Sequence, residues 1–245
     1  MTSSLPDAEL CELFDGRLKL FQKPKGYRFS VDSVLLGDFA RERAAGRVID
    51  LGTGSGVLAV ILSKLAAVRE IVGIEVQEDL AALAQKNISY NECGDRVTII
   101  RADIREIKKK FPAGSFDAVI SNPPFYPVKS GLLNEDSGKA VSRHELHGTL
   151  ADFLSISAYL LKISGAFLTI YPCSRLGDLI EEMRKATLEP KTLRFIHPKF
   201  EEPANLVLAE GIKGAGRQAL VLPPLTLYDA DGGYSRQARE IFRKV

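Results

Sequence analysis

Apolar runs alternate with amphipathic stretches through the central part of the chain. The runs read RVIDLG, REIVGIE, RVTII, FDAVIS and GAFLTIYP. Amphipathic stretches follow them in turn at 57–66, 78–91, 103–110, 150–162 and 175–187. Such alternation is typical of βαβ units, whose right-handed crossovers produce a parallel sheet with helices on both faces. The pattern therefore predicts an α/β fold.

Further elements are predicted at both ends of this region. Two strands, at 193–197 and 204–212, have no good helix between them, so we expect an antiparallel pair at the end of the sheet. Near the start, Asp15-Gly16 separates two apolar runs and predicts a small N-terminal hairpin. No low-complexity linker divides the chain. We therefore expect a hairpin and lid segment over 1–33 and one main domain over 34–245.

Composition narrows the class of protein. With 245 residues, of which 45% are hydrophobic, the chain can bury a sizeable core, and its net charge of +2 excludes neither small substrates nor nucleic acid. Cys11, Cys93 and Cys173 form no metal-ligand spacing with the histidines, so no metal is expected. The N-terminus lacks the features of a secretion signal, and no run of about eighteen apolar residues occurs. These features predict a cytoplasmic protein that does not enter a membrane.

A glycine-rich turn, Asp50-Leu51-Gly52-Thr53-Gly54-Ser55-Gly56, follows the first strand of the predicted sheet. Ligands bind at the carboxyl ends of parallel strands, where glycines let the backbone approach them closely. Position 57 is Val, so the third glycine falls one residue too early for the dinucleotide fingerprint G-x-G-x-x-G. This spacing argues against a nicotinamide or flavin enzyme. A purely structural tight turn is the alternative.

Acidic residues follow the next two strands. Glu75 ends the second strand, where two carboxylate oxygens could accept both hydroxyls of a ribose. Asp103 follows the third strand, where it could accept an adenine amino group. Each acid alone could also be a helix N-cap or a solvated loop residue. Their place at consecutive strand ends, beside the glycine-rich turn, favours a nucleoside site.

The tetrapeptide Asn122-Pro123-Pro124-Phe125 follows the fourth strand and suits a planar exocyclic amine. Prolines fix φ and supply no N–H, and the residue before them is restricted to an extended conformation, so the segment is stiff and its carbonyls stay free. The Asn122 side-chain oxygen and the Pro123 carbonyl can each accept an amine N–H, while Phe125 can stack on the ring that carries the amine. An ordinary proline-rich turn is the alternative.

Taken together, these motifs resemble the class I S-adenosylmethionine-dependent methyltransferases, in the amino-methylating branch with an (N/D/S)PP(F/Y/W) signature. The resemblance implies S-adenosyl-L-methionine as the cofactor and a Rossmann-like, seven-stranded, mostly parallel sheet with an antiparallel last strand. It also implies that Glu75 binds the ribose and Asp103 the adenine. The remaining cofactor-binding positions that it implies in the core are Asp50, Gly52, Thr53, Gly54 and Gly56 for the methionine part, and Asn122.

Segments outside the motifs are similar to the bacterial valine-tRNA adenine-N6 methyltransferases, which modify the adenosine beside the anticodon. They are 26–33 (GYRFSVDS), 143–145 (RHE), 211–214 (GIKG), 223–225 (PPL), Tyr228 and 233–234 (GY). By this resemblance Tyr27, Phe29 and Asp32 lie over the cofactor. The alternative is a hydrophobic lid in which Asp32 caps a helix that begins at Ser33. Arg143 would meet RNA phosphate or order the loop after the NPPF motif, and capping of the next helix is its alternative.

A basic window with interleaved aromatic residues covers 16–31 and contains no acid. Lys23, Lys25 and Arg28 are candidate phosphate contacts there, and Phe125 with Tyr126 would stack on the target base. A solvated charged face is the alternative reading of the window.

We therefore expect an RNA partner, tRNA, with adenine N6 as the methylated group. The NPPF motif alone fits two other amines equally well, guanine N2 of ribosomal RNA and a glutamine amide of a protein. An inactive RNA-binding module is the alternative that is not an enzyme.

Overall fold

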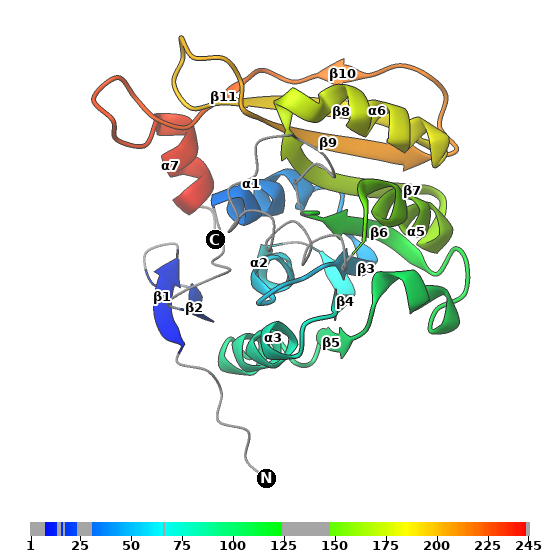
Figure 1. Cartoon of the computed structure of the whole chain (residues 1–245). Coiled ribbons are helices and arrows are strands. Elements are labelled where there is room, and N and C mark those ends of the chain that lie inside the picture. The colour runs from blue at the N-terminus through cyan, green and yellow to red at the C-terminus, as the bar shows by residue number, and fades with distance from the viewer. Residues whose placement is uncertain are drawn as a thin grey trace, which may run out of the picture.

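The computed structural model describes residues 8–13, 16, 18–23, 31–65, 67–123 and 148–243. Within them, the largest sheet has nine strands in the order β10-β8-β9-β7-β6-β3-β4-β5, with β11 also paired to β8 (Figure 1). Its strands are β3 (Gly46–Leu51), β4 (Val68–Glu75), β5 (Val97–Arg101), β6 (Phe116–Ser121), β7 (Leu161–Pro172), β8 (Leu188–His197), β9 (Leu206–Lys213), β10 (Leu220–Val221) and β11 (Leu225–Thr226).

Seven of these strands are long, and they form the predicted mostly parallel sheet. β3, β4, β5, β6 and β7 pair parallel with one another, whereas β9 pairs antiparallel with both β7 and β8. The predicted antiparallel last strand is therefore confirmed. Two short strands of two residues each, β10 and β11, add to β8 in parallel and were not predicted.

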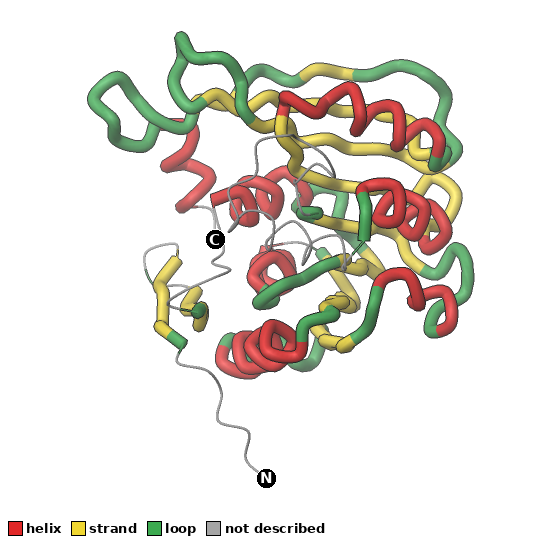
Figure 2. The backbone as a smooth tube through the Cα atoms, viewed as in Figure 1, coloured by secondary structure: helices red, strands yellow, loops and turns green. Residues whose placement is uncertain are grey.

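Helices cover both faces of the sheet (Figure 2), as the alternating pattern predicts. One apolar layer holds buried residues of α1, α2, α3 and α7, and the other holds those of η1, α5 and α6. The helices are α1 (Val31–Ala40), α2 (Val57–Leu65), α3 (Glu78–Tyr90), α5 (Leu150–Leu160), α6 (Leu176–Lys185) and α7 (Arg236–Arg243), with the 3₁₀ turns η1 (Ile104–Lys109) and η2 (Cys173–Arg175).

The predicted N-terminal hairpin is confirmed. Its strands β1 (Glu9–Leu13) and β2 (Leu18–Gln22) pair antiparallel, with Leu13 opposite Leu18. Leu18 and Leu20 of β2 are buried and belong to the same apolar layer as α1 and α2. The alternation of buried and half-buried positions along β2 is the pattern of a strand with one face on the core.

Three predicted boundaries were wrong. α1 begins at Val31, so Asp32 lies inside its first turn and does not cap a helix from Ser33. The segment after β5, predicted as an amphipathic stretch over 103–110, is a 3₁₀ helix over Ile104–Lys109 that buries Ile104 and Ile107. β7 begins at Leu161, inside the predicted helix over 150–162, because Leu161 already pairs with Phe116 of β6.

The order of the strands reverses at β3, and this positions the site. β4 and β5 follow on one side of β3, whereas β6 and β7 follow on the other. Loops that leave such a switch point diverge to opposite faces and open a crevice at the carboxyl ends of the strands. The motifs predicted to bind a ligand follow β3, β4, β5 and β6, so they all lie along this carboxyl edge.

Candidate functional site

The glycine-rich loop after β3 uses all three of its glycines. Gly52, Gly54 and Gly56 have φ values of +75°, +58° and +78°, in the left-handed region that other residues rarely adopt. A Cβ at Gly56 would also lie 3.1 Å from the Cβ of Ala84 on α3. Side chains at these positions would therefore strain the loop, and one at Gly56 would also push it away from α3.

Hydrogen bonds attach this loop to β4 and to its own strand. The backbone N–H groups of Gly52 and Thr53 both donate to the Ile74 carbonyl, each at 2.9 Å. The Thr53 hydroxyl donates to Asp50 Oδ2 at 2.6 Å. Burial raises the pKa of Asp50 to about 7, the nearby negative charge of Glu75 adds to that rise, and the Thr53 hydrogen bond opposes it. Asp50 is therefore a loop-ordering residue whose charge is sensitive to its surroundings.

Glu75 ends β4 with a carboxylate held in one orientation. Its Oε2 accepts the Gly54 N–H and its Oε1 accepts the Gln77 N–H, both at 2.9 Å. The residue is 5% exposed. Each carboxylate oxygen has about two acceptor positions, so each keeps one for a ligand hydroxyl. Within the described residues, neither Glu75 nor Asp50 has a Lys or Arg partner, in contrast to Asp103 at the same edge, which pairs with Arg105.

Asn122 leaves β6 next to this loop. Asp50 pairs with Ile120 across β3 and β6, and the Ser121 hydroxyl donates to the Leu51 carbonyl at 2.8 Å, so the two strand ends are fixed side by side. The Asn122 Oδ1 is buried and has no hydrogen-bond partner among the described residues. An amide oxygen in that state costs free energy unless a donor satisfies it. Pro123, directly after it, is buried.

Asp103, at the end of β5, is more engaged than the sequence indicates. Its carboxylate caps η1 by accepting the Arg105 N–H at 2.9 Å. It also accepts from the Arg105 guanidinium, with Nε at 3.0 Å from Oδ1. The Ala102 N–H donates to the Glu75 carbonyl at 3.0 Å, so the ends of β4 and β5 lie together as predicted.

Of the remaining predicted site residues, the structure describes only Lys23 and Asp32. Tyr27, Phe29, Lys25, Arg28, Pro124, Phe125, Tyr126 and Arg143 fall outside the described residues. Lys23 forms an ion pair with Asp79 of α3, and this contact lowers the pKa of Asp79. Because its charge is balanced there, Lys23 anchors the hairpin, and its contact with RNA stays a prediction.

Two residues near the loop were missed by the sequence reasoning. The amide of Asn87 donates to the Ser55 carbonyl, and the Ser55 hydroxyl is buried without a partner among the described residues. Asn87 follows Leu80 by seven positions and Leu83 by four, on the buried face of α3. A polar residue where the helical period requires an apolar one was the available signal.

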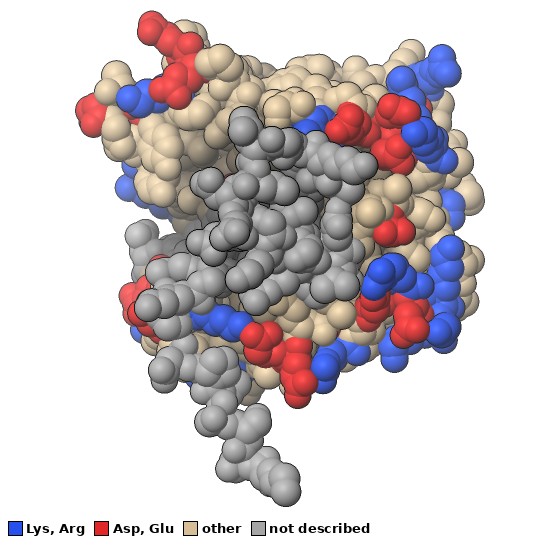
Figure 3. All heavy atoms as spheres, in the orientation of Figure 1, with Lys and Arg blue, Asp and Glu red and all other residues tan. Residues whose placement is uncertain are grey.

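Metal ligands and membrane spans were searched over the same residues. No three His, Cys, Asp or Glu side chains of the described ranges gather in a way that could hold a metal ion. No described helix combines the length and apolar character needed to cross a bilayer. Along the right-hand border of the face in Figure 3, basic and acidic side chains are interspersed rather than segregated.

Comparison with known proteins finds methyltransferases among those similar to this chain. A family model described as "Methyltransferase small domain" matches residues 30–135. A tRNA1(Val) (adenine(37)-N6)-methyltransferase of Porphyromonas gingivalis is 34% identical over 158 residues, which cover 62% of this chain and 61% of that protein. The protein of the same name from Photobacterium profundum is 28% identical over 214 residues, covering 86% and 88%.

Solved structures share the fold. A predicted O-methyltransferase from Agrobacterium tumefaciens superposes with a TM-score of 0.69 at 17% identity, covering 87% of this chain and 96% of that one. A putative RNA methyltransferase from Pyrococcus horikoshii gives 0.57 at 19% identity, covering 81% and 93%. The family model, the relatives and the fold are thus all those of methyltransferases, and they imply S-adenosyl-L-methionine as the cofactor.

Proposed function

We propose that this chain transfers a methyl group from S-adenosylmethionine to adenine N6 in a tRNA, near the anticodon. The observation that carries the proposal is the buried Asn122 Oδ1, which lacks a donor among the described residues and lies beside the glycine-rich loop. The relatives named as tRNA1(Val) adenine-N6 methyltransferases supply the choice of amine and of RNA. The prediction of a cytoplasmic location accompanies that choice.

The residues at the carboxyl edge fit the cofactor. S-adenosylmethionine supplies an electrophilic methyl group on a positively charged sulfur. Asp50 and Glu75 are buried and lack a basic partner in the described structure, so they favour a cationic ligand. The two carboxylate oxygens of Glu75 are held in place by hydrogen bonds from the Gly54 and Gln77 N–H groups, and the acceptor position that each oxygen keeps free suits a ribose hydroxyl. Asp103 would accept the adenine amino group while it keeps Arg105.

Asn122 and Pro123 would hold the substrate amine. An adenine amine is a poor nucleophile, because its lone pair is delocalised into the ring. If the Asn122 Oδ1 and the Pro123 carbonyl accept its two N–H groups, the nitrogen lone pair is aimed along one line, and the positive charge that develops on nitrogen is stabilised. The buried setting strengthens both hydrogen bonds. The chain would thus act by positioning and electrostatics.

The remaining predicted contacts concern the RNA. Phe125 and Tyr126 would replace the stacking that the target base loses when it leaves its neighbours, a contribution of about 1–3 kcal/mol per base. Arg143, Lys25 and Arg28 would meet phosphates. These roles rest on the sequence resemblance and on general physical chemistry.

Mass spectrometry of tRNA nucleosides tests the proposal. Cells that lack this protein should lose N6-methyladenosine from tRNA, and the purified protein should restore it with S-adenosylmethionine. Parallel reactions on ribosomal RNA and on release factors distinguish the other amines. Transfer to guanine N2 or to a glutamine amide, with none to tRNA, would contradict the proposal. Cofactor binding without transfer to any of them would favour an inactive RNA-binding module.

A further inference from the structure

A single buried side chain connects the N-terminal hairpin to the glycine-rich loop. Asn87 of α3 is fully buried. Its Nδ2 donates to the Ser55 carbonyl at 2.8 Å and to the Phe21 carbonyl at 2.9 Å, and its Oδ1 accepts the Phe21 N–H at 2.7 Å. The amide therefore uses both donors and an acceptor, and it pairs with β2 as the backbone of a neighbouring strand would.

The hairpin is attached to α3 at several other points. Asn91 Nδ2 donates to the Lys19 carbonyl at 2.8 Å, one helical turn beyond Asn87. The Phe21 ring meets Tyr90 edge to face at 5.1 Å between centroids, and the Lys86 ammonium lies 3.6 Å from the centre of the Phe21 ring. These contacts fix β2 on the helix without touching the glycine-rich loop.

The loop is attached to the same face of α3. Gly56 approaches Ala84 so closely that an added Cβ would lie 3.2 Å from the Ala84 Cα. Ala84 precedes Asn87 by three residues, so both contacts lie on one side of the helix. A displacement of the Asn87 amide would therefore move the hairpin and the loop together, because interfaces as closely packed as this one do not deform independently.

We propose that Asn87 is a positioning residue that couples docking of the hairpin to the geometry of the cofactor loop. Hairpin docking and S-adenosylmethionine binding then favour each other, and thermodynamic linkage requires the effect to be equal in both directions. This inference rests on the cofactor assignment and not on the choice of tRNA as substrate.

Matched aspartate variants test the coupling. Asn87→Asp keeps the size of the side chain and an acceptor for Phe21, but it loses both donated hydrogen bonds at pH 8. Asn91→Asp is the control, since it adds the same charge and loses a hairpin bond without touching the loop. We expect calorimetry to show an S-adenosylmethionine Kd raised about tenfold by Asn87→Asp and less than about twofold by Asn91→Asp. An equal rise in both variants, or no rise in either, would overturn the coupling.

Hydrogen exchange tests the reciprocal direction in the unaltered chain. Saturating S-adenosylmethionine should slow exchange of the Phe21 amide about tenfold and leave the Phe195 amide of β8 unchanged. Unchanged exchange at Phe21 contradicts the proposal even if Asn87→Asp fails to fold. Both measurements need no RNA. Absence of cofactor binding by the unaltered chain would instead count against the proposed methyl transfer.

Discussion

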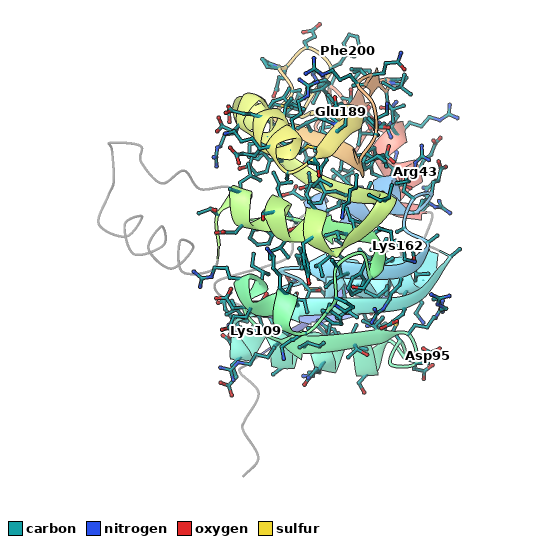
Figure 4. All side chains as sticks on the ribbon, turned by 90° about the vertical axis from the view of Figure 1, so that its right-hand side faces the viewer. Arg43, Asp95, Lys109, Lys162, Glu189 and Phe200 are labelled. Atoms are coloured by element: carbon teal, nitrogen blue, oxygen red, sulfur yellow. The ribbon has the colours of Figure 1, made fainter. Side chains whose placement is uncertain are left out.

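Asp117 at the amino edge of the central sheet is paired with cationic groups, whereas Asp50 and Glu75 at the carboxyl edge have no Lys or Arg partner within the described residues, although Asp103 at that edge pairs with Arg105. At the amino edge, Asp117 accepts the Arg47 N–H at 2.8 Å and the Lys162 ammonium at 2.5 Å, and Arg47 also pairs with Glu70 at 2.8 Å. In Figure 4, Arg43, Lys162 and Asp95 are spread along one side of the view, and Lys109 lies on the opposite side. At the carboxyl edge, Asp50 and Glu75 receive only hydroxyl and amide hydrogens within the described residues.

This difference separates stability from ligand binding. Ion pairs at the amino edge neutralise charge within the protein, and the Arg47 guanidinium adds a cation–π contact 4.6 Å from the Phe116 ring centre. The carboxyl edge keeps its negative charge for a partner from outside. The preorganised acceptors there need no rearrangement when a cationic ligand arrives, which favours tight binding.

The largest expected effect comes from Asn122→Ala. Removal of the buried acceptor should lower the rate of methyl transfer by about a thousandfold, because one preorganised polar group at a reacting centre contributes about that much. The Kd for S-adenosylmethionine should change by less than about twofold. Single-turnover transfer and calorimetry measure the two quantities. Asn122→Asp, which keeps an acceptor oxygen, is the control and should retain more activity. Unaltered turnover in Asn122→Ala would contradict the role given to this residue.

Glu75→Ala should mainly weaken the binding of S-adenosylmethionine. It removes the acceptors for the ribose and leaves the Gly54 and Gln77 N–H groups without partners, so we expect cofactor affinity to fall by about a hundredfold. Glu75→Gln keeps one acceptor oxygen and should lose less. Calorimetry gives the Kd of each variant. An Ala variant with native affinity would show that the ligand does not reach this carboxylate.

Arg47→Met removes an ion pair and ring contacts at the amino edge and should leave cofactor binding at the carboxyl edge unchanged. Loss of its pairing with Glu70 and of its ring contacts should lower the free energy of unfolding by about 1–2 kcal/mol, measured by urea denaturation. The Kd for S-adenosylmethionine should stay unchanged. Arg236→Met on α7, whose pair with Glu240 is exposed, is the control and should cost less than about 0.5 kcal/mol. A change in cofactor affinity would contradict the separation of the two edges.

The smallest effect concerns pH. The folded-state pKa of Asp50 is raised from an ordinary value of 3.8 to about 7, so protonation favours the folded chain below that pH, and this contribution to stability is lost as pH rises through about 7. A cationic ligand favours the ionised form. Cofactor affinity should therefore rise about threefold between pH 6 and pH 8, and Asp50→Asn should flatten the profile. A profile that runs the other way would contradict this electrostatic account.

The core of the fold was predictable because its strands are continuous apolar runs that end in special residues. β3 ends before Gly52, β4 at Glu75 and β6 before Asn122, so the strand ends and the candidate site could be located together. The positions of Asp50, Glu75 and Asn122 along one edge follow from parallel pairing alone. Burial, and with it the raised pKa of Asp50, could not be read from the pattern.

The features that the sequence did not predict depend mostly on contacts that appear only in the folded chain. β10 and β11 have two residues each, too few for a periodic pattern, and they exist because β8 offers an edge to pair with. Asn87 stands out as a polar residue on the buried face of α3, but its partners, Phe21 of the hairpin and Ser55 of the glycine-rich loop, are distant in the sequence. The pairing of Asp103 with Arg105 is a local contact, two residues apart, that depends on the turn of η1.

The edge strand β10 carries one consequence for self-association. Leu220 and Val221 are 60% and 55% exposed, and an unpaired apolar strand is a template for the growth of intermolecular sheets. After Leu222, whose N–H donates to the Leu193 carbonyl, come Pro223 and Pro224, which have no N–H to offer, so an incoming strand would find only a short ladder to extend. The proline pair at 123–124 is predicted to leave carbonyls free for a substrate, whereas the pair at 223–224 is expected to limit strand pairing with another chain.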